Sequence, residues 1–275
     1  MSDRPLRRMA PVLWHATLIA VVIAMVFPVL WALLTSFKPA GDIYSLTPFS
    51  AEPTLENYAR VFADWPVLTL LGNTFVMAAG VAVGQIVIAV LGAYALVHFS
   101  QRARGPILVL VTISLAIPPQ ALIIPQFLMT ARLGWLNTDA GLIVPQLGTC
   151  ALAVLLLVQH VDALPRTLTN AARLDGARPF EVLWHIVLPG LRPAIAAVAI
   201  LVFITTWNEY LWPLLVAPKP EDTTVQIGLT QFQTAEGNDF GGLLAAATLT
   251  SIPIVVVYLF ASRRITDAFL QSGIK

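Results

Sequence analysis

Long apolar runs separated by short polar segments dominate the chain. Six of these runs approach or exceed the roughly 20 residues that a membrane-spanning helix needs. They cover about residues 12–35, 71–98, 106–130, 139–160, 191–216 and 241–262. The third run contains Pro118, Pro119 and Pro125, and because proline kinks a helix, we expect this span to be bent and to line a cavity or a mobile interface. The pattern predicts an all-α integral membrane protein with six transmembrane helices.

Composition excludes a soluble domain with its own polar surface. Of the 275 residues, 57% are hydrophobic and 11% are charged, whereas soluble domains carry about 25% charged residues. The net charge of +1 argues against a nucleic-acid partner, and the single Cys150 excludes an intrachain disulfide and a cysteine-based metal cluster. The first run follows three arginines in the manner of a signal peptide. However, it is too long for one and lacks a small-x-small cleavage site, so we interpret it as a retained span.

Lysine and arginine are distributed unevenly between the segments that connect the runs. If both termini lie on the same side, that side holds 12 of these residues and the other side holds 4. The four are Lys38, Arg60, Arg132 and Lys219. Cytoplasmic segments are enriched in lysine and arginine, so we predict that both termini are cytoplasmic.

The runs divide the chain into three parts. We expect an N-terminal span and an extracytoplasmic loop over residues 1–66, a transmembrane domain over 67–262 and a cytoplasmic tail over 263–275. Within the loop, "TLENYARVF" predicts a short helix with Thr54 as its N-cap, because a threonine hydroxyl accepts a free N–H group of the first helical turn.

One polar stretch, "LPRTLTNAARLDGARPFEVLWHIVLPG" over residues 164–190, interrupts the apolar pattern between the fourth and fifth runs. The predicted orientation places it in the cytoplasm. Its first half predicts a helix that ends in a left-handed turn at Gly176, and one face of this helix carries four residues at helical spacing. They are Leu168, Ala171, Ala172 and Asp175. A second amphipathic helix is expected from Pro179 until Leu188-Pro189 closes it before the fifth span. The physical pattern alone also fits an amphipathic helix that lies on the membrane surface.

The same stretch resembles the EAA signature of bacterial ABC importer permeases of the maltose-type carbohydrate family. The matching positions are Asn170, Ala171, Ala172, Asp175, Gly176, Ala177, Ile186, Val187, Leu188 and Pro189. "IPPQALIIPQF", "WNEYLWPLLV" and the terminal "RRITDAFLQSGIK" resemble the same family, and two stretches also resemble its glycerol-3-phosphate branch. The resemblance implies that residues 170–189 form a coupling helix that docks onto an ATPase. Because Asn170 replaces the glutamate of the family, we expect packing at Ala171 and Ala172, rather than charge, to dominate this contact.

The resemblance also implies the surroundings of the chain. It describes a transport subunit rather than an enzyme, in the bacterial inner membrane, paired with a second permease subunit. Two copies of a cytoplasmic ATP-binding subunit and an extracytoplasmic solute-binding protein complete such an importer. The chain contains no G-x-x-x-x-G-K-[ST] loop, so we expect ATP and magnesium to be bound by the ATPase and no cofactor to be bound by this chain.

Polar and aromatic residues near the end of the fifth run are candidates for a substrate pathway. They are Trp207, Asn208, Glu209, Tyr210 and Trp212, together with Gln120 of the third run. Glu209 is a carboxylate within a predicted span, where an ionisable group is costly and usually marks a functional site. In the alternative interpretation, Asn208 and Glu209 satisfy broken backbone near Pro213, and the aromatic residues form an interfacial belt.

Three functions remain open from the residues. The first is import of a sugar or sugar-like solute, and the second is import of glycerol-3-phosphate or a glycerophosphodiester. No lysine or arginine lies in the interior of the six runs, which favours a neutral solute, since phosphate recognition normally uses such groups. The third is ion-coupled secondary transport, which usually requires inverted repeats that are missing from this sequence.

Overall fold

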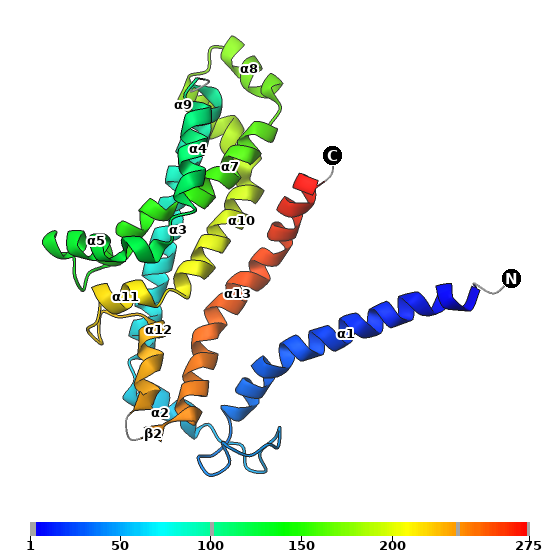
Figure 1. Cartoon of the computed structure of the whole chain (residues 1–275), viewed down its shortest axis with the longest axis vertical. Coiled ribbons are helices and arrows are strands. Elements are labelled where there is room, and N and C mark those ends of the chain that lie inside the picture. The colour runs from blue at the N-terminus through cyan, green and yellow to red at the C-terminus, as the bar shows by residue number, and fades with distance from the viewer. Residues whose placement is uncertain (1–3, 100–101, 235–236, 274–275) are drawn as a thin grey trace. The chain divides into compact units, whose positions relative to one another are not determined.

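A computed structural model describes residues 4–99, 102–234 and 237–273. The chain divides into two compact units. The first unit comprises residues 1–67 and 229–251, and the second comprises residues 68–228 and 252–275. Apart from one pair of two-residue strands, the regular elements of the described residues are helical, as predicted (Figure 1).

Four helical segments are long and apolar enough to cross a membrane. They are Trp14–Thr35 of α1 (Arg4–Thr35), α3 (Val67–His98), the continuous helix Pro179–Trp207 and Phe240–Phe260 of α13 (Phe240–Gly273). Two bent helix pairs account for the third and fourth predicted runs. The number of candidate spans therefore reaches the predicted six if each bent pair crosses the membrane once.

The third run is bent much more sharply than a single proline kink. It consists of α4 (Arg104–Ser114) and α5 (Pro119–Arg132), whose axes differ by 92°. Pro118 is extended, with φ −64° and ψ 132°. A residue that precedes a proline avoids the helical conformation, so the Pro118-Pro119 pair separates the two helices. In the fourth run, α6 (Asp139–Ile143) and the 3₁₀ helix η1 (Pro145–Thr149) meet α7 (Ala151–Ala163) at 53°.

The fifth run differs from the prediction at both ends. The helix that begins at Pro179 is not closed at Leu188-Pro189, so that part of the prediction is wrong. Instead, α9 (Pro179–Val182) continues through a π-helical turn, η2 (Leu183–Val187), into α10 (Leu188–Trp207). The Leu188 N–H donates to the Leu183 carbonyl, five residues earlier, which is the bond of a π-helical turn. The helix continues through Pro189 although this residue has no N–H to donate. The predicted span also breaks after Trp207, and helix resumes only in α11 (Leu211–Val216).

Three glycines explain close packing in the two units. In the second unit, a Cβ at Gly80 of α3 would lie 2.6 Å from the Ile143 side chain. A Cβ at Gly84 would lie 2.5 Å from the Leu147 side chain. Two glycines four residues apart therefore let the η1 region approach the backbone of α3, as small residues do in membrane helix pairs. In the first unit, a Cβ at Gly241 would lie 2.6 Å from the Asn57 side chain.

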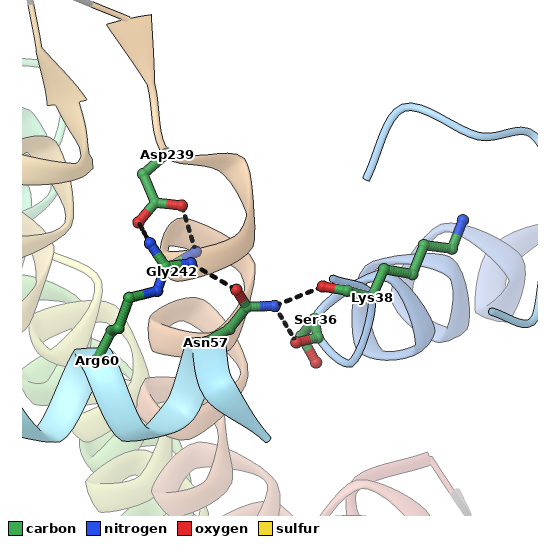
Figure 2. Close-up of polar contacts among 6 residues, drawn as sticks. All are labelled: Ser36, Lys38, Asn57, Arg60, Asp239 and Gly242. Atoms are coloured by element: carbon green, nitrogen blue, oxygen red, sulfur yellow. Dashed lines mark hydrogen bonds and ion pairs between the residues drawn. The ribbon is translucent and has the colours of Figure 1, made fainter. Parts of the chain in front are cut away.

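A polar network stabilises the first unit (Figure 2). Its α2 helix (Glu56–Asp64) carries Asn57, whose amide donates to the Ser36 and Lys38 carbonyls at 2.8 Å each. Arg60 donates to Asn57 at 2.7 Å and pairs with Asp239 at 3.0 Å. The Asp239 carboxylate also accepts the Gly242 N–H at the start of α13 (2.9 Å). The network joins the end of α1, α2 and the start of α13.

Short elements complete the two units. The N-cap of α2 is Leu55 rather than the predicted Thr54, although the Thr54 hydroxyl still accepts the Glu56 N–H at 3.1 Å. The predicted N-cap was therefore wrong by one residue, but the Thr54 hydroxyl does accept an N–H group of the first turn, as predicted. The remaining elements are α8 (Arg166–Leu174), α12 (Val225–Gly228), η3 (Leu229–Phe232) and the antiparallel strands β1 (Gln233–Thr234) and β2 (Gly237–Asn238).

Candidate functional site

Helix α8 presents a mixed surface. Thr169 is buried, whereas Leu168, Asn170 and Ala171 are exposed. Ala172 is half-buried and packs against the core of its own unit, so it does not share the exposed face on which the sequence pattern placed it. Ala172 lies three residues after the buried Thr169, so the two residues share the side of α8 that packs on its own unit.

The turn after α8 has the predicted left-handed glycine. Gly176 has φ +83°, and no atom lies within 4 Å of the position of a Cβ. The Gly176 N–H bonds to the Arg173 carbonyl (3.1 Å), and the Ala177 N–H bonds to the Ala172 carbonyl (2.9 Å). These two bonds form a Schellman motif. The half-buried Ala177 packs on the same core as Ala172, while Asp175 is exposed.

The helix that follows anchors the segment and exposes an apolar patch. The Glu181 carboxylate accepts the Arg178 N–H at 2.7 Å, and the Tyr94 hydroxyl donates to the Pro179 carbonyl at 2.7 Å. Phe180 and Trp184 stack at 6.1 Å between ring centroids and are 66% and 59% exposed. Leu174 nearby in the sequence is 89% exposed. Exposed apolar side chains in this number indicate an interaction surface.

The other predicted coupling residues lie beyond this patch. Ile186 and Leu188 are half-buried and pack against the core of the second unit, whereas Pro189 is exposed. These two contacts attach the π-helical turn and the start of α10 to that core.

A cavity of about 320 Å³ lies within the second unit. Its walls come from α3, α5, η1, α7, α10 and α11. The polar groups of its lining are four amides, three hydroxyls and one carboxylate: Gln85, Gln120, Gln126, Gln146, Thr149, Thr205, Thr206 and Glu209. The apolar part includes Ile123, Leu201 and Trp212. A concave apolar site with a few polar groups is the usual form of a small-molecule site.

Hydrogen bonds within the chain hold the side chains of five of these polar residues: Gln85, Gln146, Thr149, Thr205 and Glu209. Gln85 is buried, and its amide donates to the Gln146 carbonyl (2.8 Å) and to the Thr149 hydroxyl (3.0 Å). One oxygen of Glu209 accepts the N–H groups of Leu211 (3.1 Å) and Trp212 (3.3 Å) at the start of α11. Glu209 therefore satisfies the broken backbone, as the alternative interpretation of this residue expects, and it also lines the cavity.

The structure brings three of the six predicted pathway residues to the cavity: Gln120, Glu209 and Trp212. The Trp212 indole donates to the Gly141 carbonyl at 3.1 Å and holds α11 against α6. The other three are absent from its lining. Trp207 is buried in a separate cluster with Phe203, the Asn208 amide donates to the Ile204 carbonyl (2.8 Å), and Tyr210 is exposed.

Sequence reasoning missed the other polar residues that line the cavity. Gln85, Gln126, Gln146 and the neighbouring threonines lie inside predicted apolar runs. A usable signal was present, since amides at membrane depth are costly unless they have partners or face a cavity. Across the described residues, no group of three His, Cys, Asp or Glu side chains is placed to hold a metal ion.

Comparison with known proteins places this geometry among transport proteins. Residues 85–269 match the family described as "binding-protein-dependent transport system inner membrane component". The arabinooligosaccharide transport permease of Halalkalibacterium halodurans is 31% identical over 98% of this chain and 99% of its own length. The trehalose/maltose permease of Thermococcus litoralis is 31% identical over 100% and 99%, and the sn-glycerol-3-phosphate permease of Yersinia pestis is 31% identical over 97% and 98%.

A solved structure has the same fold. It is a bacterial ABC transporter that imports the acidic polysaccharide alginate, and a chain of this transporter matches with a TM-score of 0.81 and 23% identity. The match covers 95% of this chain and 97% of the other.

Proposed function

The chain belongs to the family of binding-protein-dependent transport system inner membrane components, the permease subunits of ATP-binding cassette importers, and we propose that it carries a neutral sugar or a sugar-like polyol. It is a multi-pass membrane protein and a transport subunit, not an enzyme. The proposed solute site of this subunit is the cavity of the second unit, whose walls include α3, α5, α10 and α11.

The observation that carries the proposal is the chemistry of this cavity. Amides and hydroxyls supply both donors and acceptors, which match the hydroxyl groups of a sugar. Among the residues that line the cavity, none is a lysine or arginine, and Glu209 is a carboxylate. A phosphate or carboxylate solute would meet this carboxylate without a compensating cation, at a depth where charge pairs are weakly screened. A neutral solute avoids this cost.

The relatives carry solutes of both kinds, so sequence similarity alone does not choose between them. The names of the permeases from Halalkalibacterium and Thermococcus give neutral oligosaccharides, and the name of the Yersinia permease gives an anionic phosphate ester. The absence of cations from the cavity lining favours the first kind for this chain.

The proposed assembly follows from the family. This chain pairs with a second permease subunit, two copies of a cytoplasmic ATP-binding subunit and an extracytoplasmic solute-binding protein. The ATPase binds ATP and magnesium, and no cofactor is bound here. Both termini lie in the cytoplasm, as the 12-to-4 distribution of lysine and arginine predicts. Helix α8 and the Gly176 turn then face the ATPase, and α10 connects them to the cavity.

Uptake measurements test the proposal. In cells that express the importer, accumulation of labelled neutral oligosaccharides should stop on ATP depletion and survive proton and sodium uncouplers. Glycerol-3-phosphate should neither accumulate nor compete. Uptake that stops with the uncouplers would refute the ATP-driven importer. ATP-dependent accumulation of glycerol-3-phosphate, with no neutral solute transported, would refute the proposed substrate class.

A pair of variants tests whether the cavity contributes to transport. Gln126 is half-buried and lines the cavity, whereas Gln159 of α7 is exposed and is not part of its lining. Gln126→Leu should reduce uptake about tenfold, because a lost hydrogen bond to a sugar hydroxyl costs about 1.4 kcal/mol. Gln159→Leu should transport like the parent. Equal uptake by both variants would argue that solute passes elsewhere.

A further inference from the structure

Helix α8 carries positive charge that forms no ion pair with the described residues of its own chain. Its sequence, RTLTNAARL, contains two arginines and no acidic residue. Within the part of the chain that the structure describes, neither Arg166 nor Arg173 has an ion pair. Arg166 lies four residues before Asn170 and Arg173 lies three residues after it, so all three side chains are neighbours along one side of the helix.

These residues surround a small polar cavity. It has a volume of about 140 Å³ and lies between α8 and the ends of α3 and α7. Arg166, Thr169, Asn170 and Arg173 line it from α8, and His98, Asp162 and Leu164 line it from the other side. Asp162 is already paired with Arg104, whose Nη1 donates to the Asp162 Oδ1 at 3.0 Å. The two guanidinium groups of α8 at this cavity therefore have no ion pair among the described residues.

We propose that this cavity receives a carboxylate side chain of the ATPase subunit, so that the permease supplies the cations of the docking contact and the ATPase supplies the anion. The inference rests on the proposed function, since it takes α8 to be the helix that the ATPase covers. It changes the expectation that packing alone holds this contact. A carboxylate fits because guanidinium groups bind it by charge-assisted, directional hydrogen bonds.

The position of Asn170 favours a protein partner over a lipid headgroup. Asn170 lines the cavity and is exposed, and Ala171 beside it is exposed and small. Leu174, four residues after Asn170, lies on the same side of α8 and is exposed, so a protein surface that packs on Leu174 also covers the cavity at Asn170. The exposed Leu174, Phe180 and Trp184 continue this surface in the same segment. Apolar side chains around a desolvated charge pair are the usual arrangement of a protein–protein contact.

Substitution of Asn170 gives the sharpest test. A glutamate at this position would lie within reach of both arginines of its own helix, at the i−4 and i+3 positions, and would neutralise them. Asn170→Glu should therefore weaken the affinity of the permease for its own ATPase subunit about tenfold, in the range measured for interfacial charge pairs. Asn170→Gln has the same length without the charge, and its effect should be much smaller. Equal or tighter binding by Asn170→Glu would overturn the proposal.

Arginine variants and salt provide an independent measurement. The importer is purified with its ATPase, and release of the ATPase is followed with increasing KCl. Arg173→Gln should raise the dissociation constant of the ATPase at low salt, and this constant should depend less steeply on KCl than in the parent. Arg192→Gln, at an exposed arginine of α10 outside both the cavity lining and the docking segment, controls for a general loss of charge. Identical behaviour of the two arginine variants would overturn the proposal.

Membrane composition separates the two sources of an anion. The same affinities are measured in nanodiscs of phosphatidylcholine alone and of phosphatidylcholine with phosphatidylglycerol. The effect of Arg173→Gln should be the same in both membranes if a protein carboxylate fills the cavity. An effect that appears only with phosphatidylglycerol would assign the cavity to a lipid phosphate and refute the proposal. ATP-dependent uptake by the parent importer is measured first, so that failure of the proposed function is recognised separately.

Discussion

Substitutions at Gly176 can distinguish the effect of the left-handed backbone from the effect of side-chain size. Gly176 has φ +83°, and the space around its missing Cβ is empty within 4 Å. The Cβ of an alanine would therefore meet no neighbour here, and the cost of Gly176→Ala within this chain is the cost of the left-handed conformation. That cost is about 1–2 kcal/mol for an ordinary L-residue, and it is smaller for asparagine, whose side chain tolerates this region.

These values predict an order of variants. Gly176→Asn should be mildest, Gly176→Ala should lower the population of the native turn by a factor of about 5 to 30, and the β-branched Gly176→Val should be worst. As the turn opens, the bonds from Gly176 to Arg173 and from Ala177 to Ala172 are lost. The direction of α8 relative to α9 then becomes undefined.

The assay is solute-stimulated ATP hydrolysis by the assembled importer in proteoliposomes. Stimulation should fall in the order asparagine, alanine, valine while insertion of the permease stays intact. Gly105, in the first turn of α4, is the matched control. It also has no atom within 4 Å of a Cβ, but it has no left-handed backbone, so Gly105→Ala should be neutral. If asparagine proves more harmful than alanine, side-chain volume governs this site and the reasoning from φ is refuted.

Four further predictions concern other parts of the chain. A reporter fused after Lys275 should be active only on the cytoplasmic side, and activity outside would reverse the proposed topology. Glu209→Gln keeps the oxygen that accepts the N–H groups at the start of α11 but loses the charge, so uptake should fall while the complex stays assembled. Glu209→Ala also loses this oxygen, so the free energy of unfolding should fall by about 1 kcal/mol and the melting temperature should be lower. The buried ammonium of Lys38 donates three hydrogen bonds, which Lys38→Met removes together with the charge. The loop over residues 39–55 should lose about 3 kcal/mol of local stability, so its proteolysis should accelerate about a hundredfold. An unchanged rate of cleavage would contradict this prediction. Ala172→Arg should displace α8 from its own core and release the ATPase in pull-downs, unlike Asn170→Ala.

The features that sequence predicted are those that local chemistry determines. Six apolar runs are readable because lipid requires a continuous apolar helix surface at each crossing. The turn at Gly176 is readable because glycine is the residue that adopts a positive φ without strain. The break at Pro118-Pro119 was expected, but its angle of 92° was not, since the angle depends on what the two helices pack against.

The cavity could not be assembled from sequence because its walls meet only in the folded chain. Gln85 bonds to Thr149, 64 positions away, and Trp212 bonds to Gly141, 71 positions away. The same limit explains why Trp207 was assigned to the pathway. Its neighbours in sequence are polar, yet its indole is buried against Phe203 and α3. Apolar periodicity in a membrane helix does not separate a side that faces lipid from a side that packs on protein.

The continuous helix from Pro179 to Trp207 has a mechanical consequence for coupling. Its 29 residues span about 43 Å at 1.5 Å per residue, and they connect the docking segment to the break at Glu209. From the end of η2 along α10, a buried stripe at helical spacing comprises Val187, Leu191, Ala194 and Val198. Rotation of α10 about its own axis would expose this stripe, so we expect a pull on α8 to move α10 together with the helices it packs on, as a rigid body. The π-helical turn at Leu183–Val187 is packed on the same core through Leu183 and Val187, so we expect it to move with α10.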